Sequence, residues 1–236
     1  MVASVGPSPT IAAMRLHLVR AGQGSPPIVL VHGMGSSSAT WARCMELLQD
    51  RFQVVAIDLL GHGASPVPDD PAAYTRDAAL ADIDELLADL GEPAVLVGHS
   101  LGGYLALAHA ATRPGATRAI VVINTGPGFR DPVKREGWND MARRNAHRFG
   151  VPPQVSGLNL QHDSVVMDRL AEMDVPTLVL AGSLDRAEYQ ASGQYLERKM
   201  PHARLLVIEG GEHAMHEASH ATEVTAAIAA FIDTLT

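Results

Sequence analysis

Residues 94–103 read AVLVGHSLGG, and this stretch decides the fold. Its first half is a short apolar run rich in valine, which predicts a strand buried on both faces. Apolar residues at helical spacing follow as far as Arg113 and predict a helix. Almost no residues remain for the turn between them, so the residue at its apex is expected to adopt a strained backbone conformation beside small neighbours.

The apex residue is Ser100, flanked by Gly98 and Gly102 in the pattern G-x-S-x-G. A strand that reverses this sharply into a helix exposes the apex side chain at the carboxyl end of the sheet. The helix N-terminus beside it favours negative charge. This arrangement presents a serine as a nucleophile. The alternative is a glycine-rich turn with an incidental serine, and the strand before and the helix after Ser100 weigh against it.

The rest of the chain repeats the alternation of strand and helix. Further strands are predicted at residues 14–20, 27–31, 52–57, 118–123, 177–181 and 204–208. Further helices are predicted at residues 40–50, 74–90, 163–173, 188–200 and 222–235. Such alternation is typical of an α/β fold with a mainly parallel sheet covered by helices on both faces, in which ligands bind beyond the carboxyl ends of the strands.

Residues 126–162 break the alternation and predict a short helical cap inserted over the active edge. Four prolines punctuate the segment, and one helix is expected from about residue 133 to 149. The core of the predicted α/β fold then consists of residues 1–125 and 163–236. The many arginines of the cap predict a solvated helix face. A sharper hypothesis is that Arg143 or Arg144 binds an anionic substrate.

Composition narrows the function classes. The formal net charge of −8 argues against nucleic acid as a partner. Cys44 is the only cysteine, which excludes an internal disulfide and suits a reducing compartment. Residues 1–11 lack the pattern of a signal peptide, and no apolar run is long enough to span a membrane. We therefore expect a cytoplasmic protein with no membrane partner, and a homodimer stays open.

Two other predicted strands end near polar residues that suit catalysis. Asp185 follows the strand at 177–181, and His213 follows the strand at 204–208. A serine hydroxyl needs an adjacent base, and the base needs an acid to orient it. The chain order Ser100, Asp185, His213 is the order associated with an elbow of this kind. No ligand cluster with metal spacing is found, so neither a metal nor another cofactor is expected.

These motifs resemble the α/β-hydrolase superfamily over nearly the whole chain. The matching segments are His32-Gly33, Asp58…Gly61-His62-Gly63…Ser65, the elbow at residues 98–103, Gly182…Asp185 and Gly210…His213. The expected fold is a mainly parallel eight-stranded sheet flanked by helices. The resemblance implies Ser100 as the nucleophile, His213 as the base and Asp185 as the acid. It also implies an oxyanion hole formed by the backbone N–H groups of Met34 and Leu101.

Rival residues exist for two of these roles. His216 is the closest rival of His213, and His99 lies inside the elbow, where it should face away from the serine. The rivals of Asp185 are Asp163, Asp168 and Glu212. The residues expected to line the substrate pocket come from the elbow, from the loop after the strand at 27–31 and from the cap. They are Gly33, His99, Trp138, Met141, Arg143 and Arg144. Phe149 of the cap could add to an apolar wall.

The expected reaction is acyl transfer to water, with a small-molecule carboxylic ester, lactone or thioester as the substrate. One alternative is a C–C bond hydrolase or lyase that acts on a carboxylate-bearing keto or dienoate substrate, which basic cap residues would suit. Another is a ligand-binding protein that retains the fold without turnover. The presence of Ser100, Asp185 and His213 together argues against the last alternative.

Overall fold

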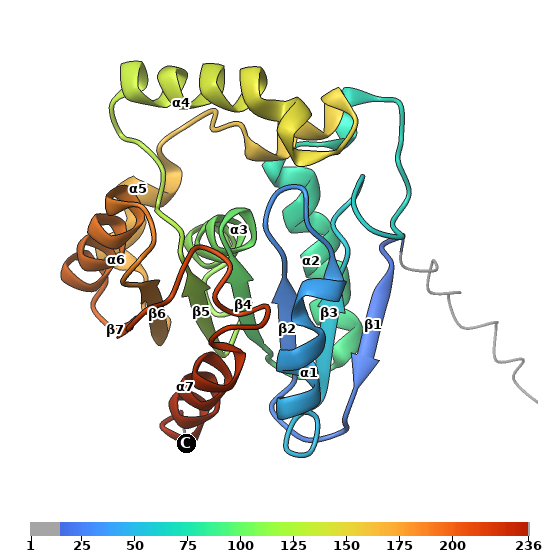
Figure 1. Cartoon of the computed structure of the whole chain (residues 1–236), viewed down its shortest axis with the longest axis vertical. Coiled ribbons are helices and arrows are strands. Elements are labelled where there is room, and N and C mark those ends of the chain that lie inside the picture. The colour runs from blue at the N-terminus through green and yellow to red at the C-terminus, as the bar shows by residue number, and fades with distance from the viewer. Residues whose placement is uncertain (1–14, 236) are drawn as a thin grey trace, which may run out of the picture.

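The computed structural model describes residues 15–235 (Figure 1). Two expectations lie outside the described residues: the missing signal peptide in residues 1–11 and the start of the first strand at Met14. Within residues 15–235, no helix combines the length and the apolar character that a membrane span requires.

Seven strands form a single sheet in the described part of the chain, in the order β1-β3-β2-β4-β5-β6-β7. β1 pairs antiparallel with β3, and all other neighbours are parallel. The strands are β1 Leu18–Ala21, β2 Ile28–Val31, β3 Val54–Ile57, β4 Val95–His99, β5 Ala119–Ile123, β6 Thr177–Gly182 and β7 Ala203–Ile208. The predicted α/β class with a mainly parallel sheet is confirmed, with seven strands in the described residues where eight were expected.

Helices cover both faces of this sheet (Figure 1). They are α1 Ala42–Leu48, α2 Arg76–Leu90, α3 Leu101–Thr112, α4 Pro132–Asn145, α5 Val165–Arg169, α6 Ala187–Lys199 and α7 Ala221–Asp233. Alternation along β2 sends Val29 and Val31 into the core beneath α2, α3, α5 and α6. Ile28 and Leu30 point to the opposite face, where α1 and α7 pack. The inner strands β2 to β6 are therefore buried on both sides, as their continuous apolar runs predict.

Two predicted helices end in a 3-10 helix and are shorter than expected. The helix expected at 133–149 ends at Asn145 and continues as a 3-10 helix, Ala146–Phe149, before Gly150 in the left-handed region at φ 65°. The helix expected at 163–173 is α5 followed by the 3-10 helix Leu170–Glu172. α5 begins at Val165 and not at Asp163, because the Asp163 carboxylate accepts the Val165 N–H at 3.1 Å. A side chain that accepts such a bond lies just before a helix and not inside it.

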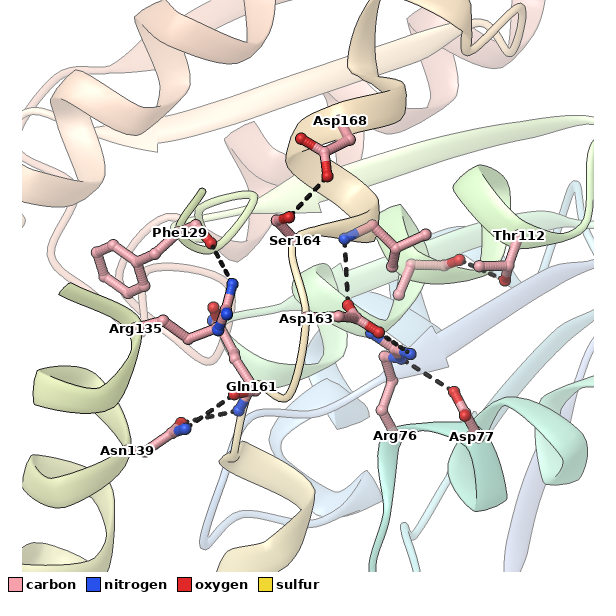
Figure 2. A network of polar contacts seen from close by, with 12 residues as sticks. Arg76, Asp77, Thr112, Phe129, Arg135, Asn139, Gln161, Asp163, Ser164 and Asp168 are labelled. Carbon is pink, nitrogen blue, oxygen red and sulfur yellow. Dashed lines mark hydrogen bonds and ion pairs between the residues drawn. The ribbon is translucent and has the colours of Figure 1, made fainter. Parts of the chain in front are cut away.

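Residues 126–162 lie above the carboxyl ends of the strands, with α4 crossing the top of the molecule (Figure 1). Within the segment, the Asn139 amide and the Gln161 backbone exchange two hydrogen bonds of 2.8 Å. The chain re-enters the core at Asp163, whose two carboxylate oxygens accept from Arg76 of α2 at 2.7 and 2.9 Å (Figure 2). The Asp163 carboxylate raises the pKa of the Arg76 guanidinium. This bidentate pair fixes the end of the segment to α2.

The turn from β4 into α3 brings three backbone segments into direct contact. A Cβ atom on Gly98 would lie 2.2 Å from the carbonyl carbon and oxygen of Gly102. A Cβ atom on Gly102 would lie 2.2 Å from the Val31 carbonyl oxygen at the end of β2. Only glycine fits at these two positions, because backbone atoms occupy the space that any side chain would need.

We predict that Gly98→Ala lowers the free energy of unfolding by about 3 kcal/mol or more, because the new methyl group overlaps rigid backbone. Gly137→Ala is the matched control: it lies inside α4 with nothing within 4 Å of its Cβ position. That change should raise the free energy of unfolding by about 0.5–1 kcal/mol through helix propensity. Denaturant unfolding of both variants measures the difference, and equal effects would contradict the prediction.

Candidate active site

Ser100 lies at the apex of the turn with φ 50° and ψ −112°, so the expected strained conformation is present. Its N–H donates to the Ile123 carbonyl at 2.9 Å. Its carbonyl accepts from the Thr125 hydroxyl at 2.7 Å and from the Tyr104 N–H at 3.0 Å. These bonds to β5 and α3 hold the backbone in a conformation that it would not adopt alone, and they leave the partly exposed side chain at the carboxyl edge of the sheet.

Asp185 and His213 meet at this same edge. His213 Nδ1 lies 2.8 Å from Asp185 Oδ2, and Asp185 Oδ1 accepts the Arg186 N–H at 2.7 Å. Both carboxylate oxygens are thereby oriented in a side chain that is only 2% exposed. A bond from Nδ1–H to the carboxylate leaves Nε2 with a lone pair, which is the tautomer that a general base needs. No hydrogen bond joins His213 to Ser100 within the described residues; in an enzyme without bound substrate such bonds are often long.

Asn124 connects the two loops that carry these side chains. It follows β5 with φ 47°, in the left-handed region that asparagine tolerates. Its amide nitrogen donates to the backbone carbonyls of Glu212 at 3.0 Å and His213 at 2.8 Å, and its amide oxygen accepts the Gly182 N–H at 2.9 Å. The sequence motifs did not predict a role for Asn124. The available signal was an asparagine directly after a buried strand at the catalytic edge.

The loop after β2 places backbone amides beside Ser100. A Cβ atom on Gly33 would lie 3.3 Å from the Ser100 Cβ. The next two residues are Met34 and Gly35, and the Gly35 N–H donates to His62 Nε2 at 3.1 Å. Within the described residues, the backbone N–H groups of Met34 and Leu101 have no protein acceptor. They are thus available to an oxygen atom bound next to Ser100, as an oxyanion hole requires.

Buried neutral histidines shape the same loop. His32 Nε2 accepts the Leu59 N–H at 3.0 Å, so its Nδ1–H donates to the Gly33 carbonyl at 2.7 Å. Burial lowers the pKa of His32 to about 4. Burial also lowers the pKa of His62. Both rings therefore act as neutral hydrogen-bonding groups that set the position of the loop.

The two rival histidines have other environments. His216 is fully buried between the rings of Trp41 and His99, with ring centroids at 4.2 and 4.3 Å. Burial lowers the pKa of His216 to about 3. His99 Nε2 lies 2.8 Å from the His213 carbonyl, and burial lowers the pKa of His99 well below its usual value. His99 thus supports the backbone of the loop that carries His213, whereas only His213 has a carboxylate partner of the three.

The rival carboxylates are engaged elsewhere. Asp163 pairs with Arg76, and Asp168 accepts from the Ser164 hydroxyl at 2.6 Å, both visible in Figure 2. Asp168 also accepts from Arg130 at 2.8 Å. The Glu212 side chain is exposed next to His213. Asp185 is the carboxylate that the structure brings to His213.

The candidate pocket residues divide into two groups. Gly33 and His99 lie against each other and against Ser100, since a Cβ atom on Gly33 would lie 3.0 Å from His99 Nδ1. Trp138 donates its indole N–H to the Asn159 carbonyl at 3.0 Å inside the cap. Met141, also on α4, is partly buried.

The two cap arginines that the sequence suggested for anion binding are exposed. Arg143 forms ion pairs with Glu136 at 2.7 Å and Asp140 at 3.1 Å on its own helix. Arg144 is an exposed neighbour. The ion pairs of Arg143 therefore fit the prediction of a solvated helix face better than the hypothesis that Arg143 binds an anionic substrate.

The sequence suggested Phe149 for an apolar wall but did not predict its contact with Gly35, and it missed Tyr189. The cap rests on the loop after β2, because a Cβ atom on Gly35 would lie 2.6 Å from the Phe149 carbonyl oxygen. Tyr189 lies one helical turn past Asp185, and its ring centroid is 4.8 Å from that of His213. Contacts of this kind join segments far apart in the chain, and sequence spacing alone does not reveal them.

Comparisons with known proteins show which family this chain belongs to. A family model described as the Alpha/beta hydrolase family matches residues 28–228. The pimeloyl-[acyl-carrier protein] methyl ester esterase of Xanthomonas campestris pv. campestris (strain B100) is 31% identical, with 93% of this chain and 100% of that protein aligned.

Solved structures show the same likeness. A thermophilic esterase from Thermogutta terrifontis has a TM-score of 0.80 at 25% identity, with 93% of each chain covered. The enol-lactonase from Burkholderia xenovorans LB400 shares the fold, with a TM-score of 0.75 at 24% identity over 92% of this chain and 96% of that one.

We predict that the free energy of unfolding falls as the pH drops below about 6.5, because unfolded histidine binds a proton there. His216 in the folded protein stays neutral down to a pKa of about 3 and His32 to about 4. Each of these two histidines lowers the free energy of unfolding by about 1.4 kcal/mol per pH unit between about pH 6.5 and its own pKa in the folded protein.

His216→Phe should reduce this pH dependence, since it removes one of the buried histidines whose pKa is lowered. His202→Phe is the control, because His202 is exposed and pairs with Asp174 at the surface. Denaturant unfolding at several pH values between 4 and 7 gives the slopes. A slope unchanged in His216→Phe would contradict the prediction.

Proposed function

This chain belongs to the alpha/beta hydrolase family, and from that premise we propose that it is a serine esterase acting through an acyl-enzyme. In this proposal Ser100 is the nucleophile, His213 the general base and Asp185 the acid that orients it. The observation that carries the proposal is the 2.8 Å bond between His213 Nδ1 and Asp185 Oδ2, formed at the sheet edge where the strained Ser100 lies.

Acylation begins when the Ser100 hydroxyl attacks the carbonyl carbon of the substrate. His213 Nε2 takes the hydroxyl proton, and Asp185 stabilises the imidazolium that forms. The negative charge moves to the carbonyl oxygen, which the N–H groups of Met34 and Leu101 bind. Each such donor contributes about 3 kcal/mol to stabilisation of the transition state. The tetrahedral intermediate then collapses, and His213 returns the proton to the departing alcohol or thiol.

Deacylation repeats these steps with water. His213 removes a proton from the water molecule as its oxygen attacks the acyl carbon. The same two amides bind the second oxyanion, the bond to Ser100 Oγ breaks, and His213 gives the proton back to the serine. The carboxylic acid leaves and the starting state of the three side chains is restored.

The substrate class we favour is a carboxylic ester with a modest acyl group, or a lactone or thioester of similar size. The Xanthomonas relative is named for a methyl ester esterase activity, and the Thermogutta structure is of an esterase. We also propose that residues 126–162 act as the cap of this site. Phe149 supports that role because its backbone lies against Gly35, next to the proposed oxyanion hole.

We predict that Ser100→Ala lowers kcat by about 10⁴-fold or more, because no nucleophile remains. His213→Ala should have a loss of similar size. Asp185→Asn should impair kcat while the protein stays folded, since the imidazole loses its orienting charge. The matched control is His216→Phe, which should retain kcat. If His216→Phe were inactive and His213→Ala active, the assignment of the base would be wrong.

A panel of p-nitrophenyl esters with increasing acyl length tests the reaction itself, together with covalent labelling of Ser100 by a fluorophosphonate. Turnover with labelling is the expected result. Labelling without ester turnover would favour a C–C bond hydrolase or a lyase instead. Neither labelling nor turnover would favour a ligand-binding protein of the same fold.

A further inference from the structure

Tyr189 contacts the side chain that the proposed function makes the general base. It lies on α6, and its ring packs on the His213 imidazole with centroids 4.8 Å apart and planes inclined by 32°. The His99 ring also contacts His213, with a centroid distance of 4.8 Å and an angle of 59°. His213 therefore touches two rings besides the Asp185 carboxylate, and its side chain is still 36% exposed.

Tyr189 is the last ring in a continuous series of aromatic contacts. The series starts at the buried Trp41, passes through His216 and His99 to His213, and ends at Tyr189. The rings before His213 are buried, so packing from all sides fixes them. Tyr189 is partly exposed, and its position depends on fewer neighbours.

The side chain of Arg186 also contacts the Tyr189 ring. Its guanidinium carbon lies 4.7 Å from the ring centroid, a distance at which a cation and an aromatic face attract. The backbone N–H of Arg186 also donates to Asp185 Oδ1. One residue thus orients both the acid and the tyrosine.

The Tyr189 hydroxyl stays protonated. Burial raises the pKa of the phenol, and the Arg186 charge offsets part of that rise. The contact with His213 is therefore made by an uncharged ring.

We propose that Tyr189 is a positioning residue for the base: its ring holds the His213 imidazole between Asp185 and Ser100 and stabilises the imidazolium formed when Ser100 gives up its proton. The inference rests on the proposed function, since it requires that His213 be the base. An aromatic face attracts a cation, so the contact is stronger after proton transfer than before it.

The charged and titratable groups around His213 come from three segments. The Asp185 carboxylate favours the imidazolium, and the exposed carboxylate of Glu212 is adjacent in the chain. His99 and His216 are neutral, because burial lowers the pKa of both. Arg186 is cationic, and its guanidinium contacts the Tyr189 ring. Loss of the Tyr189 ring removes a favourable contact with the imidazolium.

The test measures the rate of Ser100 labelling by a fluorophosphonate across pH 5–9, which needs no knowledge of the natural substrate. In Tyr189→Leu we expect the plateau rate to fall about 10-fold and the midpoint of the pH profile to move about half a unit lower, from loss of the cation–π contact. In Tyr189→Phe the midpoint should stay at its original value, since the ring remains.

The control variant is Tyr195→Leu. Tyr195 is also a partly buried ring on α6, but it lies under Lys199 and packs on the apolar core. Its replacement should leave both the plateau rate and the midpoint unchanged, even where it lowers the melting temperature.

Each outcome decides the question. Wild-type rate and midpoint in Tyr189→Leu would overturn the positioning role, and so would a lower melting temperature with an unchanged profile. The same midpoint shift in Tyr189→Phe would assign the effect to the hydroxyl and overturn the role of the ring. Absence of labelling in the wild-type protein would instead overturn the proposed function, so the two failures are distinguishable.

Discussion

The close backbone approach between the end of β2, the end of β4 and the start of α3 is the constraint on which the rest of the structure depends. Gly98 and Gly102 permit it, because any side chain there would overlap backbone atoms. The tight turn forces Ser100 into a conformation that costs about 1–3 kcal/mol in an unconstrained chain. Hydrogen bonds to Ile123 and Thr125 hold it there. The neighbouring strand β5 and the residues just after it thus hold Ser100 in its strained conformation.

The loops that carry the site are held in place by side chains that have no part in the proposed reaction. Asn124 uses three hydrogen bonds to join the loops after β6 and β7, and His99 binds the same His213 carbonyl. His32 and His62 act similarly on the loop after β2. These side chains are buried, and their surroundings have a low effective dielectric constant, which strengthens the electrostatic interactions at the site.

Most of the fold was predictable because its signals are local. The apolar strands, the elbow around Ser100 and the polar residues after two later strands can all be found from short segments of sequence. The antiparallel pairing of β1 and the break of the cap helix at Asn145 depend on packing, and the sequence did not reveal them. The same holds for Asn124, for Tyr189 and for the contact of Phe149 with Gly35, whose partners are distant in the chain. Basic residues in the cap suggested an anion site, but ion pairs on the helix surface account for Arg143.

Both ends of the segment over the site are tied to the core by side chains outside it. At one end, the Thr125 hydroxyl binds the Ser100 carbonyl; at the other, Asp163 pairs with Arg76. The intervening 126–162 stretch is therefore anchored at both ends, and between them Val155 and Leu158 pack into the core beside the sheet. Because both ends are anchored, this segment can be exchanged for the corresponding segment of another hydrolase. Such an exchange is a way to change the substrate preference that we propose while the core of the protein stays the same.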